Sequence, residues 1–446
     1  MRISVIGCGY LGAVHAACMA ELGHDVVGID VDERKVELLS AGKAPFYEPG
    51  LPELLERVAG TGRLRFTTDM AEAADAQVHF VCVGTPQRKG EYAADLTYVD
   101  AAVDALAPHL RGTADAPVLV VGKSTVPVGT AARLADRVQE LLPEGGHALL
   151  AWNPEFLREG FAVQDTLTPD RFVYGLPDGD AGATAKALLD EVYATPLGAG
   201  TPLVTTDYAT AELVKVAANS FLATKISFIN AMAEVCEKVN ADVVALADAI
   251  GHDARIGRRF LNAGLGFGGG CLPKDIRAFM ARAGELGVDQ ALTFLRDVDD
   301  INMRRRQRMV ELTREVCEGS LLGRRIAVLG AAFKPNSDDI RDSPALSVAA
   351  QLRLQGGHVT VYDPQAVENA ARAWPDLRFA ASADEAVAGA DVVLLLTEWQ
   401  EFRDLDPVAL GEQVAHRRLL DGRNALDPAT WRAAGWTYRA LGRPRG

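Results

Sequence analysis

The first residues of the chain have the pattern of a nucleotide-binding βαβ unit. A β-prone run at residues 2–6 leads into Gly7-Cys-Gly-Tyr-Leu-Gly12, a helical stretch follows at residues 13–22, and a second β-prone run ends in Asp30. Glycines in such a turn let a pyrophosphate approach the N-terminus of the helix, and an acidic residue after the second strand accepts hydrogen bonds from ribose hydroxyls. The pattern predicts a dinucleotide site at Gly7, Gly9, Gly12 and Asp30. The Asp30 carboxylate would repel a 2′-phosphate, so NAD is favoured over NADP, although Lys35 lies nearby.

The chain then alternates strands and helices in the manner of a doubly wound α/β fold. Residues 76–83, 118–122, 148–152 and 171–174 are apolar runs typical of buried parallel strands. Residues 207–250 contain neither glycine nor proline and carry apolar residues at helical spacing, which predicts one long helix followed by another. A helix of that length often separates domains or carries a dimer interface.

A second doubly wound pattern begins at residues 325–330 and continues at 359–362 and 392–396, without a complete GxGxxG. We therefore expect an α/β fold with two doubly wound Rossmann-like domains joined by a long central helix, of which only the first binds NAD. The predicted boundaries are 1–200 for the NAD-binding domain, 201–300 for a central helical dimerisation and active-site region, and 301–446 for the C-terminal Rossmann-like domain.

Composition narrows the class of protein. With 446 residues, 48% of them hydrophobic, the chain is long enough for two or three domains with sizeable cores. A formal net charge of −14 argues against nucleic acid or an anionic membrane surface as the main partner, and no segment reaches the ~20 apolar residues of a membrane helix.

Cysteine usage and the start of the chain bear on location and metal binding. The six cysteines, at positions 8, 18, 82, 236, 271 and 317, show neither CxxC pairing nor zinc-ligand spacing. The first predicted strand begins at residue 2 and leaves no room for a signal peptide. We expect a cytoplasmic protein with free thiols and no metal.

A glycine run places one of these cysteines where a nucleophile is expected. Gly266-Phe-Gly-Gly-Gly-Cys-Leu-Pro-Lys-Asp275 precedes an apolar helical stretch, and proline is favoured in the first turn of a helix. Cys271 should therefore lie beside the N–H groups of a helix start, and these groups, the helix dipole and Lys274 favour a thiolate. An isolated cysteine is more often a buried structural thiol, but the glycines, the lysine and the carboxylate together favour a nucleophile.

Motifs along the whole chain resemble those of the nucleotide-sugar 6-dehydrogenases, the UDP-glucose/GDP-mannose dehydrogenase family. Besides the Cys271 run, they are Lys123-Ser-Thr-Val-Pro-Val128, Asn153-Pro-Glu-Phe-Leu-Arg-Glu-Gly160 and Glu212-Leu-Val-Lys-Val-Ala-Ala-Asn219. The resemblance is strongest to the members that act on UDP-glucose. It implies oxidation of the C6 alcohol of UDP-glucose to UDP-glucuronate with two NAD⁺, by a homodimer or a larger homo-oligomer.

The second half of that oxidation requires a covalent adduct. An aldehyde releases a second hydride only from a tetrahedral adduct, and the Cys271 thiolate would supply it as a thiohemiacetal that becomes a thioester and is then hydrolysed. The serine that commonly precedes this cysteine is Gly270 here, which alters local hydrogen bonding without removing the nucleophile.

The resemblance implies that acids and amides assist these steps. Lys215 and Asn219 are four residues apart and share one face of a helix, from which they would bind the C6 oxygen, although the spacing alone fits a solvated pair. Asp275 would orient Lys215 or a water molecule. Glu155 is the other candidate base for hydrolysis, with Thr125 positioning the water.

The resemblance also assigns ligand contacts to residues that alone would be taken for surface positions. For the cofactor it adds Leu11, Lys35, Thr85, Thr125, Glu159, Lys274 and Arg341 to the glycines and Asp30. For the nucleotide sugar it implies Glu155, Phe156, Leu157, Arg158, Glu159, Lys215, Asn219, Phe260, Leu261, Asn262, Ala263, Gly264, Gly268, Lys334 and Arg423, together with Arg255, which would reach the neighbouring subunit's site.

Other functions stay open at this point. GDP-mannose 6-dehydrogenases share the catalytic motifs, although the run Phe260-Leu-Asn-Ala-Gly-Leu-Gly-Phe267 is more similar to the UDP-glucose type. The branch that acts on N-acetylated sugars fits less well, because it replaces the Asn-Pro-Glu-Phe-Leu segment. A non-catalytic NAD-binding regulator is the remaining alternative, and the joint presence of Cys271, Lys215, Asn219 and Asp275 argues against it.

Overall fold

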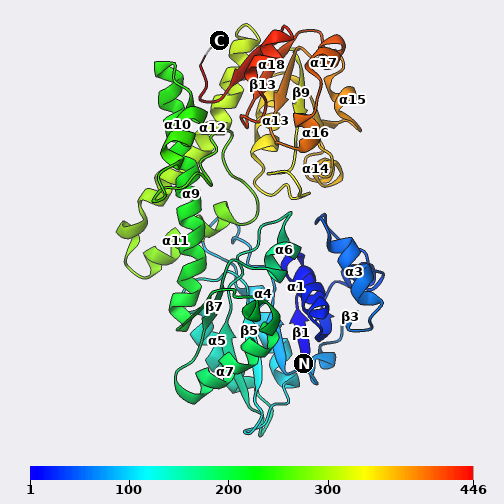
Figure 1. Ribbon diagram of the computed structural model, residues 1–446, viewed down its shortest axis with the longest axis vertical. Helices are drawn as coiled ribbons and strands as arrows, with labels where there is room; N and C mark the ends of the chain where they lie inside the picture. Colours follow the sequence, from blue (N-terminus) through cyan, green and yellow to red (C-terminus); the bar gives the residue numbers. More distant parts are fainter. Residues whose placement is uncertain (445–446) are drawn as a thin grey trace. The chain divides into compact units, whose positions relative to one another are not determined.

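The structure is a computed structural model that describes residues 1–444. The chain forms two compact units, named here unit 1 (residues 1–218 and 277–286) and unit 2 (residues 219–276 and the chain from residue 287 on). Each unit has its own sheet with helices on both faces, as Figure 1 shows. The predicted α/β class with two Rossmann-like sheets is confirmed.

Unit 1 contains an eight-stranded sheet in the order β3-β2-β1-β4-β5-β6-β7-β8. The strand order reverses between β1 and β4, and open α/β sheets bind ligands at the carboxyl ends of the strands around such a reversal. The glycine turn at residues 7–12 directly follows β1 and therefore lies at this point. The strands are β1 (Arg2–Ile6), β2 (Asp25–Ile29), β3 (Leu64–Thr67), β4 (Val78–Val81), β5 (Val118–Gly122), β6 (Ala148–Trp152), β7 (Phe172–Gly175) and β8 (Leu203–Thr206).

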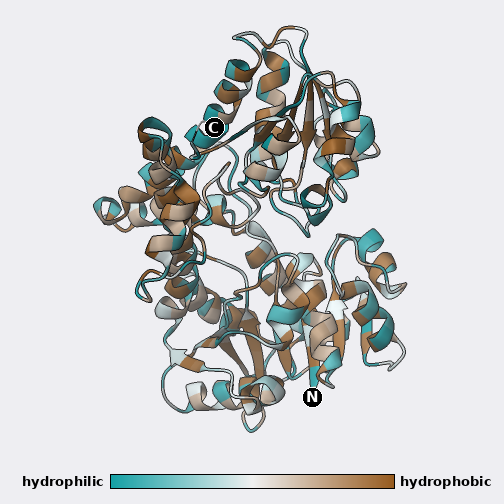
Figure 2. Ribbon diagram, turned by 45° about the horizontal axis from the view of Figure 1, so that its top comes forward, coloured by the Kyte–Doolittle hydropathy of each residue, from teal (hydrophilic) through white to brown (hydrophobic). Residues whose placement is uncertain are grey.

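The core of unit 1 lies on both faces of its sheet. Ile3 and Val5 belong to one buried apolar cluster and Ile6 belongs to the other, because successive strand residues point to opposite faces. Figure 2 shows the strands in the colour of hydrophobic residues, as expected for a sheet covered on both sides. The helices are α1 (Tyr10–Glu21), α2 (Glu33–Ser40), α3 (Leu51–Ala59), α4 (Thr97–Leu106), α5 (Thr130–Leu141), α6 (Ala162–Leu167), α7 (Gly179–Val192) and α8 (Ala194–Gly198), with short 3₁₀ turns at Met70–Ala73 and Ala107–His109.

The prediction that the strand near residues 171–174 runs parallel to its neighbours was wrong on one side. β7 pairs antiparallel to β6 and parallel to β8. A parallel connection needs a crossover that carries the chain from the end of one strand back to the end of the sheet at which that strand began. The six-residue α6 rises only about 9 Å, whereas the 14-residue α7 between β7 and β8 rises about 21 Å and completes the return.

The long central helix is confirmed. α9 (Tyr208–Val239) has 32 residues, and it ends without glycine or proline because Asn240 takes a left-handed conformation, φ 58°. The Asp242 side chain then accepts hydrogen bonds from the N–H groups of Val244 and Ala245 and starts α10 (Val243–Gly251). The predicted pair of consecutive helices therefore exists, with a three-residue break (residues 240–242) set by the capping residues Asn240 and Asp242.

Unit 2 contains a six-stranded, wholly parallel sheet in the order β11-β10-β9-β12-β13-β14. Besides α10 and the later part of α9, its helical segments include the start of α11 (Leu272–Glu285), α12 (Phe294–Val316) and a 3₁₀ turn at Asp289–Leu292. The sheet and its helices are β9 (Arg325–Leu329), α13 (Pro344–Leu354), β10 (His358–Tyr362), α14 (Val367–Ala373), β11 (Arg378–Phe379), α15 (Ala383–Val387), β12 (Val392–Leu395), α16 (Gln400–Arg403), α17 (Pro407–Gln413), β13 (Arg418–Asp421), α18 (Pro428–Ala433) and β14 (Thr437–Ala440).

Candidate active site

The glycine turn of unit 1 has the shape that a dinucleotide requires. Gly7 has φ +87°, and a Cβ on Gly12 would lie 1.8 Å from the Gly7 carbonyl oxygen, so both positions exclude a side chain. A Cβ on Gly9, in contrast, would meet nothing within 4 Å. Open space therefore adjoins the first turn of α1, whose N–H groups and dipole suit a pyrophosphate.

Asp30 stands directly after β2 and holds this turn in place. Its buried carboxylate accepts hydrogen bonds from the N–H of Cys8 at 2.7 Å and from the N–H of Asp32 at 3.0 Å. The Lys35 ammonium lies 3.7 Å from the same carboxylate. A carboxylate oxygen has a second lone pair, so these contacts leave acceptor capacity for a ribose hydroxyl.

Two further cofactor candidates lie together at the carboxyl ends of neighbouring strands. The Thr85 hydroxyl, after β4, donates to the carbonyl oxygen of Thr125, after β5, at 2.8 Å. The Ser124 hydroxyl donates to the carbonyl oxygen of Val83 at 2.6 Å and ties the same two loops a second time. Leu11 lies half-buried in the first turn of α1, beside the glycine turn.

Lys215 and Glu155 form a buried ion pair in unit 1. The Lys215 Nζ is 2.8 Å from Glu155 Oε1, and their side chains are 6% and 13% exposed. The other oxygen of Glu155 accepts from the N–H of Leu157 at 2.5 Å. Lys215 also lies 5.6 Å from the ring centre of Phe156, on whose ring the Arg171 guanidinium packs at 3.8 Å. A paired lysine and carboxylate with little access to water can exchange a proton with a hydroxyl group.

The rest of the loop at residues 153–160, named here the substrate loop, is less uniform than expected. Arg158 turns onto Asp165, with its Nε and Nη2 2.9 and 2.6 Å from the two carboxylate oxygens. Leu157 and Glu159 are half-buried. The contact of Arg158 with the nucleotide sugar stays a prediction, because the guanidinium is bound by Asp165 of α6.

Cys271 differs from the other cysteines of the chain. It directly precedes α11, and its carbonyl oxygen accepts the helix's first hydrogen bond, from the N–H of Asp275 at 2.9 Å. All six cysteines lie within the described residues, and only Cys271 is exposed. Burial raises the pKa of both Cys18 and Cys82 to about 12, and raises the pKa of Cys8, Cys236 and Cys317. The position expected for the nucleophile is therefore the accessible one.

Three other candidates of unit 2 meet at one buried carboxylate. Asp275, which is 1% exposed, accepts from the Asn219 amide at 2.6 Å and from the Lys274 ammonium at 2.6 Å. Asp275 therefore orients the amide of Asn219, a residue on α9 one turn after Lys215. A contact between Asp275 and Lys215 stays a prediction.

The glycine run before Cys271 is required by the chain's own packing. A Cβ on Gly268 would lie 2.4 Å from the Asp342 carbonyl oxygen, and a Cβ on Gly270 would lie 2.3 Å from the Arg341 guanidinium carbon. Asn302 of α12, fully buried, exchanges hydrogen bonds with the N–H and carbonyl of Phe267 at 2.7 and 2.9 Å. The run is thus anchored at its start and closes on the segment that carries Arg341.

Arg423 joins three segments of unit 2. Its guanidinium donates to the carbonyl oxygens of Leu396, Gly266 and Phe333 at 2.8, 2.8 and 3.2 Å. Leu396 follows β12, and Phe333 follows β9 and precedes Lys334, so Arg423 holds the glycine run against the carboxyl edge of this sheet.

The remaining residues expected at the nucleotide sugar differ from one another in backbone conformation and in exposure. Phe260 has φ +65°, which is rare for a bulky residue and marks functional segments more often than others. Leu261, Ala263 and Gly264 are buried and Asn262 is exposed. Lys334 lies 5.4 Å from the Phe333 ring centre. Arg255 is 89% exposed and pairs with Asp253 at 2.6 Å, so its contact with a neighbouring subunit stays a prediction.

The second Rossmann-like sheet uses its strand-end carboxylate differently from Asp30. Asp363 follows β10 and is 2% exposed. Its two oxygens accept from the backbone N–H groups of Ala331, Ala332, Gln365 and Ala366 and from the Trp399 indole, at 2.7–3.0 Å. Five protein donors occupy the acceptor sites of this carboxylate, so Asp363 has no acceptor left for a ribose hydroxyl of the kind proposed at Asp30.

Lys123, the first residue of one family motif, had no role predicted from the sequence, and it lies buried beside the substrate loop. Lys123 donates to the Asn153 side-chain oxygen at 3.0 Å and to the Tyr193 hydroxyl at 3.4 Å, and Tyr193 also donates to Asn153 at 2.8 Å. Burial lowers the pKa of Lys123 to about 8. The signal in the sequence was a lysine directly after the fully apolar run of β5, where a lysine is buried only with hydrogen-bond partners.

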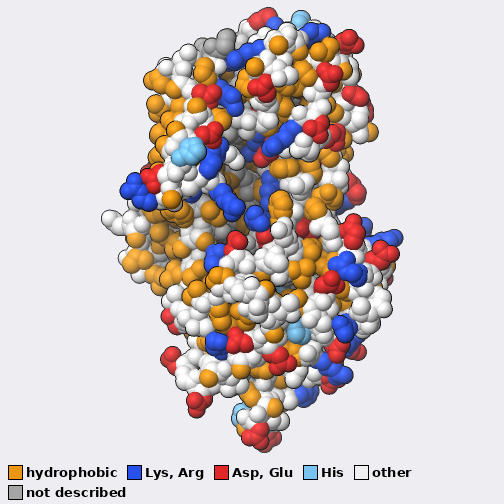
Figure 3. Space-filling view, viewed as in Figure 1, with side chains coloured by type: hydrophobic (Ala, Val, Ile, Leu, Met, Phe, Trp, Pro, Cys, Tyr) orange, Lys and Arg blue, Asp and Glu red, His pale blue; other side chains and the backbone are white. Residues whose placement is uncertain are grey.

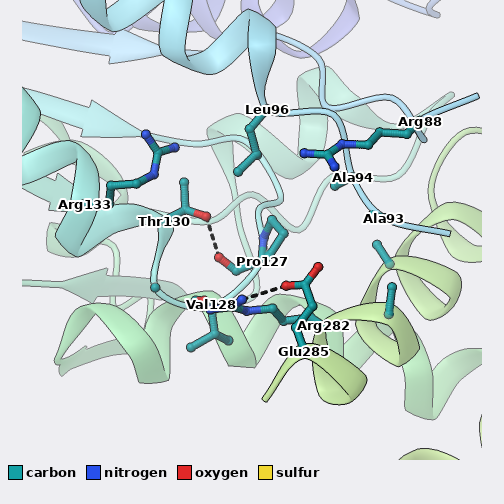
Figure 4. A pocket seen from close by; sticks show the side chains of 13 residues that line it. Arg88, Ala93, Ala94, Leu96, Pro127, Val128, Thr130, Arg133, Arg282 and Glu285 are labelled. Carbon is teal, nitrogen blue, oxygen red and sulfur yellow. Dashed lines mark hydrogen bonds and ion pairs between the residues drawn. The ribbon is translucent and has the colours of Figure 1, made fainter. Parts of the chain in front are cut away.

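Glu212, the first residue of another family motif, also had no role predicted from the sequence, although it lies one turn before Lys215 on α9. Its buried carboxylate accepts from the N–H groups of Gly129 and Ala131 at 2.7 Å each, and burial raises its pKa. Gly129 also lines a pocket of about 230 Å³, which Figure 4 shows. In the lining of this pocket Arg282 donates to the Val128 carbonyl oxygen at 2.9 Å. The loop that follows Thr125 is therefore held by polar contacts at its far end.

No cluster of histidine, cysteine and carboxylate side chains suited to a metal occurs among residues 1–444. In the same part of the chain, no helix has the length and apolar character needed to cross a membrane.

Comparison with domain models of known families gives three consecutive matches, all to the UDP-glucose/GDP-mannose dehydrogenase family. Residues 1–196 match its NAD binding domain, residues 209–304 its central domain, and residues 327–428 its UDP binding domain.

Individual relatives match over the full length. The UDP-glucose 6-dehydrogenase of Rhizobium meliloti (strain 1021) is 43% identical over all of both chains. The UDP-glucose 6-dehydrogenase TuaD of Bacillus subtilis (strain 168) is 41% identical over 99% of this chain and 93% of its own. Among solved structures, a UDP-glucose dehydrogenase from Pyrobaculum islandicum superposes with a TM-score of 0.89, at 38% identity and with 99% and 98% of the two chains covered.

Proposed function

The chain belongs to the UDP-glucose/GDP-mannose dehydrogenase family, and we propose on that basis that it oxidises UDP-glucose to UDP-glucuronate with two NAD⁺. One observation carries the chemical part of the proposal. Cys271 is the exposed cysteine of the chain and stands at the start of α11, whereas the other five are buried. Oxidation of an alcohol to an acid needs such a nucleophile, and oxidation to an aldehyde does not.

The residues of unit 1 fit a bound dinucleotide. Gly7, Gly9 and Gly12 would admit its pyrophosphate at the start of α1, and Asp30 would accept from a ribose hydroxyl. NAD⁺, when bound, accepts the hydride that leaves C6. Lys35, Thr85, Thr125 and Glu159, with Lys274 and Arg341 of unit 2, are the further contacts that we assign to the cofactor.

Proton transfer falls to the residues around Lys215 and Asn219. In the first oxidation the C6 hydroxyl loses its proton to the Lys215–Glu155 pair while the hydride leaves. The Lys215 ammonium and the Asn219 amide, which Asp275 orients, stabilise the negative charge on the C6 oxygen.

The second oxidation proceeds on Cys271. The thiolate adds to the aldehyde carbon to form a thiohemiacetal. Its hydroxyl proton passes to the Lys215–Glu155 pair and its hydride passes to a second NAD⁺, which leaves a thioester. A water molecule positioned by Thr125 and deprotonated by Glu155 or Asp275 then attacks the thioester carbonyl, and the thiolate leaves. The products are one carboxylate, two reduced cofactors and the free thiol.

Stoichiometry and a cysteine variant test this function together. We expect two NADH for each UDP-glucose consumed, with no accumulation of aldehyde. Cys271→Ala should bind both ligands but form no acid, and Cys236→Ala, which removes a buried thiol of α9, should behave as the wild type. One NADH for each sugar, or acid formation by Cys271→Ala at the wild-type rate, would show that the thioester route is wrong.

GDP-mannose or another nucleotide sugar is the alternative substrate. The UDP binding domain match at residues 327–428 supports a uridine nucleotide. Parallel assays with UDP-glucose, GDP-mannose and a UDP-N-acetyl sugar decide the point, since the preferred substrate should give the highest kcat/KM. A protein that reduces no NAD⁺ with any of them would be the non-catalytic regulator.

We propose that the protein works as a homodimer through α9. Phe221, Phe228, Val235 and Val239 are 67%, 49%, 53% and 66% exposed and are spaced seven, seven and four residues apart. Figure 3 shows hydrophobic side chains at the surface in the region where Figure 1 places α9, α10 and α11. An exposed apolar stripe along one helix is typical of an interface with a second copy.

The matches to the three domain models support a separate function for each domain of the chain. We assign residues 1–200 to NAD binding, residues 201–300 to dimerisation and the active site, and residues 301–446 to UDP-sugar binding. Lys334 and Arg423 of the last domain, together with Phe260–Gly264 and Gly268 of the central region, would contact the UDP-sugar. The six free thiols support work in a reducing compartment such as the cytoplasm.

A further inference from the structure

A buried carboxylate outside the catalytic set connects three segments of unit 1. Glu48 lies in the loop between α2 and α3 and is 2% exposed. One of its oxygens accepts two hydrogen bonds, one from the Tyr10 hydroxyl and one from the N–H of Gly160 at 2.7 Å. Its other oxygen accepts from the N–H of Ala162 at 2.7 Å.

Two partners of Glu48, Tyr10 and Gly160, belong to segments with a proposed role. Tyr10 lies between Gly9 and Leu11 in the dinucleotide turn, and its ring packs against Phe46 with centroids 4.7 Å apart. Gly160 ends the substrate loop directly after Glu159. The N–H of Gly160 also lies 3.0 Å from the Tyr10 hydroxyl oxygen, so the turn and the loop touch each other at the carboxylate.

The substrate loop is consequently anchored at both ends. At its start, the Asn153 side chain is fixed by Lys123 and Tyr193 and donates to the Val173 carbonyl oxygen at 2.9 Å. At its end, Gly160 is fixed by Glu48. Glu155, which pairs with Lys215, lies between these two anchors, so its position depends on both.

Helix capping alone does not account for Glu48. α6 begins at Ala162, and its N-cap residue Phe161 has no side-chain acceptor, so Glu48 supplies the missing cap from a distant loop. A cap would need only the backbone N–H groups, however, and the Tyr10 hydroxyl adds a contact to the cofactor turn. Burial and the neighbouring Glu48 raise the pKa of Tyr10 well above its usual value, which keeps its hydroxyl a donor.

We propose that Glu48 is a positioning residue that couples the dinucleotide turn to the substrate loop, so that cofactor binding orders the loop carrying Glu155. The proposal rests on the proposed function for its kinetic consequence, but the structural coupling exists independently of the substrate. Glu48 is buried, and Tyr10, Gly160 and Ala162 engage both of its oxygens, so we place it outside the set of residues that contact the ligands. It acts through Tyr10 on one side and through Gly160 on the other.

Two variants separate coupling from capping. Glu48→Gln keeps the shape but removes the negative charge that strengthens all three hydrogen bonds, and it places an amide NH₂ against an N–H donor. Tyr10→Phe removes the link to the turn and leaves Glu48 accepting from Gly160 and Ala162. The matched control is Asp69→Ala, which removes a carboxylate cap of unit 1 remote from the loop, where Asp69 accepts from the N–H of Ala71 at 2.9 Å.

Hydrogen–deuterium exchange of the full-length protein with and without NAD⁺ is the structural readout. In the wild type and in Asp69→Ala, NAD⁺ should slow exchange of residues 155–162. In Glu48→Gln and Tyr10→Phe that slowing should disappear, although in Tyr10→Phe the cap on α6 is retained. Unchanged protection by NAD⁺ in Tyr10→Phe would overturn the coupling, whether or not Glu48→Gln folds.

Kinetics below the unfolding temperature give the second readout. We expect kcat for NADH formation to fall at least tenfold in Glu48→Gln while the KM for UDP-glucose changes less than threefold. Asp69→Ala should lose thermal stability with kcat unchanged. Equal kcat values for Glu48→Gln and wild type would overturn the positioning role. If the wild type reduces no NAD⁺ with any nucleotide sugar, the proposed function fails, and the exchange experiment still decides the coupling.

Discussion

Replacement of Asp30 by alanine tests the cofactor site most directly. In the structure this carboxylate accepts from the N–H groups of Cys8 and Asp32 at 2.7 and 3.0 Å, and Lys35 lies 3.7 Å away. Asp30→Ala removes the proposed ribose contact and also a contact that shapes the glycine turn. Both losses should weaken the binding of NAD⁺. Only the loss of the contact that shapes the glycine turn should also change the stability of the free protein.

The magnitudes follow from these contacts. A hydrogen bond to a charged group contributes about 1.5–3 kcal/mol, so its loss should raise the Kd of NAD⁺ by about 10- to 150-fold. The buried N–H of Cys8 would lose its acceptor, which costs about 1–3 kcal/mol of unfolding free energy. Without the carboxylate, repulsion of a 2′-phosphate also disappears and Lys35 remains, so the preference for NAD⁺ over NADP⁺ should narrow.

Isothermal titration of the full-length protein with NAD⁺, NADP⁺ and UDP-glucose measures these effects separately. The matched control is Asp32→Asn, because Asp32 is a neighbouring carboxylate that caps α2 through the N–H groups of Arg34 and Lys35, and asparagine caps equally well. The control should bind NAD⁺ as the wild type does. An Asp30→Ala protein that binds NAD⁺ within twofold of wild type would refute the ribose contact. Equal weakening of UDP-glucose would show a general loss of structure instead.

Two further predictions concern stability and assembly. Burial lowers the pKa of Lys123 from its ordinary 10.5 to about 8. Between about pH 8 and pH 10.5 the unfolded chain therefore binds more protons than the folded protein does. The free energy of unfolding should rise with pH in this range, by at most about 1.4 kcal/mol per pH unit. Lys123→Met, in which Tyr193 still donates to Asn153, should lack this rise in denaturant unfolding, and parallel curves for the two proteins would contradict the shift. Phe228→Glu should convert the dimer to a monomer in sedimentation experiments, whereas Val408→Glu, at an exposed site of α17 (55%), should not; a monomeric wild type or a dimeric Phe228→Glu would contradict the α9 interface.

The regular elements were predictable because their signals are local. The runs that form β5 and β6 are apolar over their whole length, and such runs are buried on both faces of a parallel sheet. The absence of glycine and proline from residues 207–250, together with apolar residues at helical spacing, is likewise a local signal, and it indicated α9 and α10. The direction of β7 was not predictable, since it depends on whether α6 is long enough to carry the chain back across the sheet.

The sequence by itself determined which residues are chemically competent. A cysteine ahead of a helix start, a GxGxxG turn and an aspartate after the second strand are properties of order along the chain, and short-range backbone geometry gives them their meaning. They were enough to single out Cys271 and Asp30 before any contact was known. Family membership rests on the same order of motifs.

Only the tertiary structure decided which partner each of these groups takes. Asp30 and Asp363 both follow the second strand of a Rossmann-like sheet, yet five protein donors surround Asp363, whereas two backbone N–H groups bond to Asp30. Glu48 meets Gly160 across 112 positions of sequence. Hydrogen bonds and ion pairs act over about 3 Å, so they depend on how distant segments pack, and local sequence patterns carry no record of that distance.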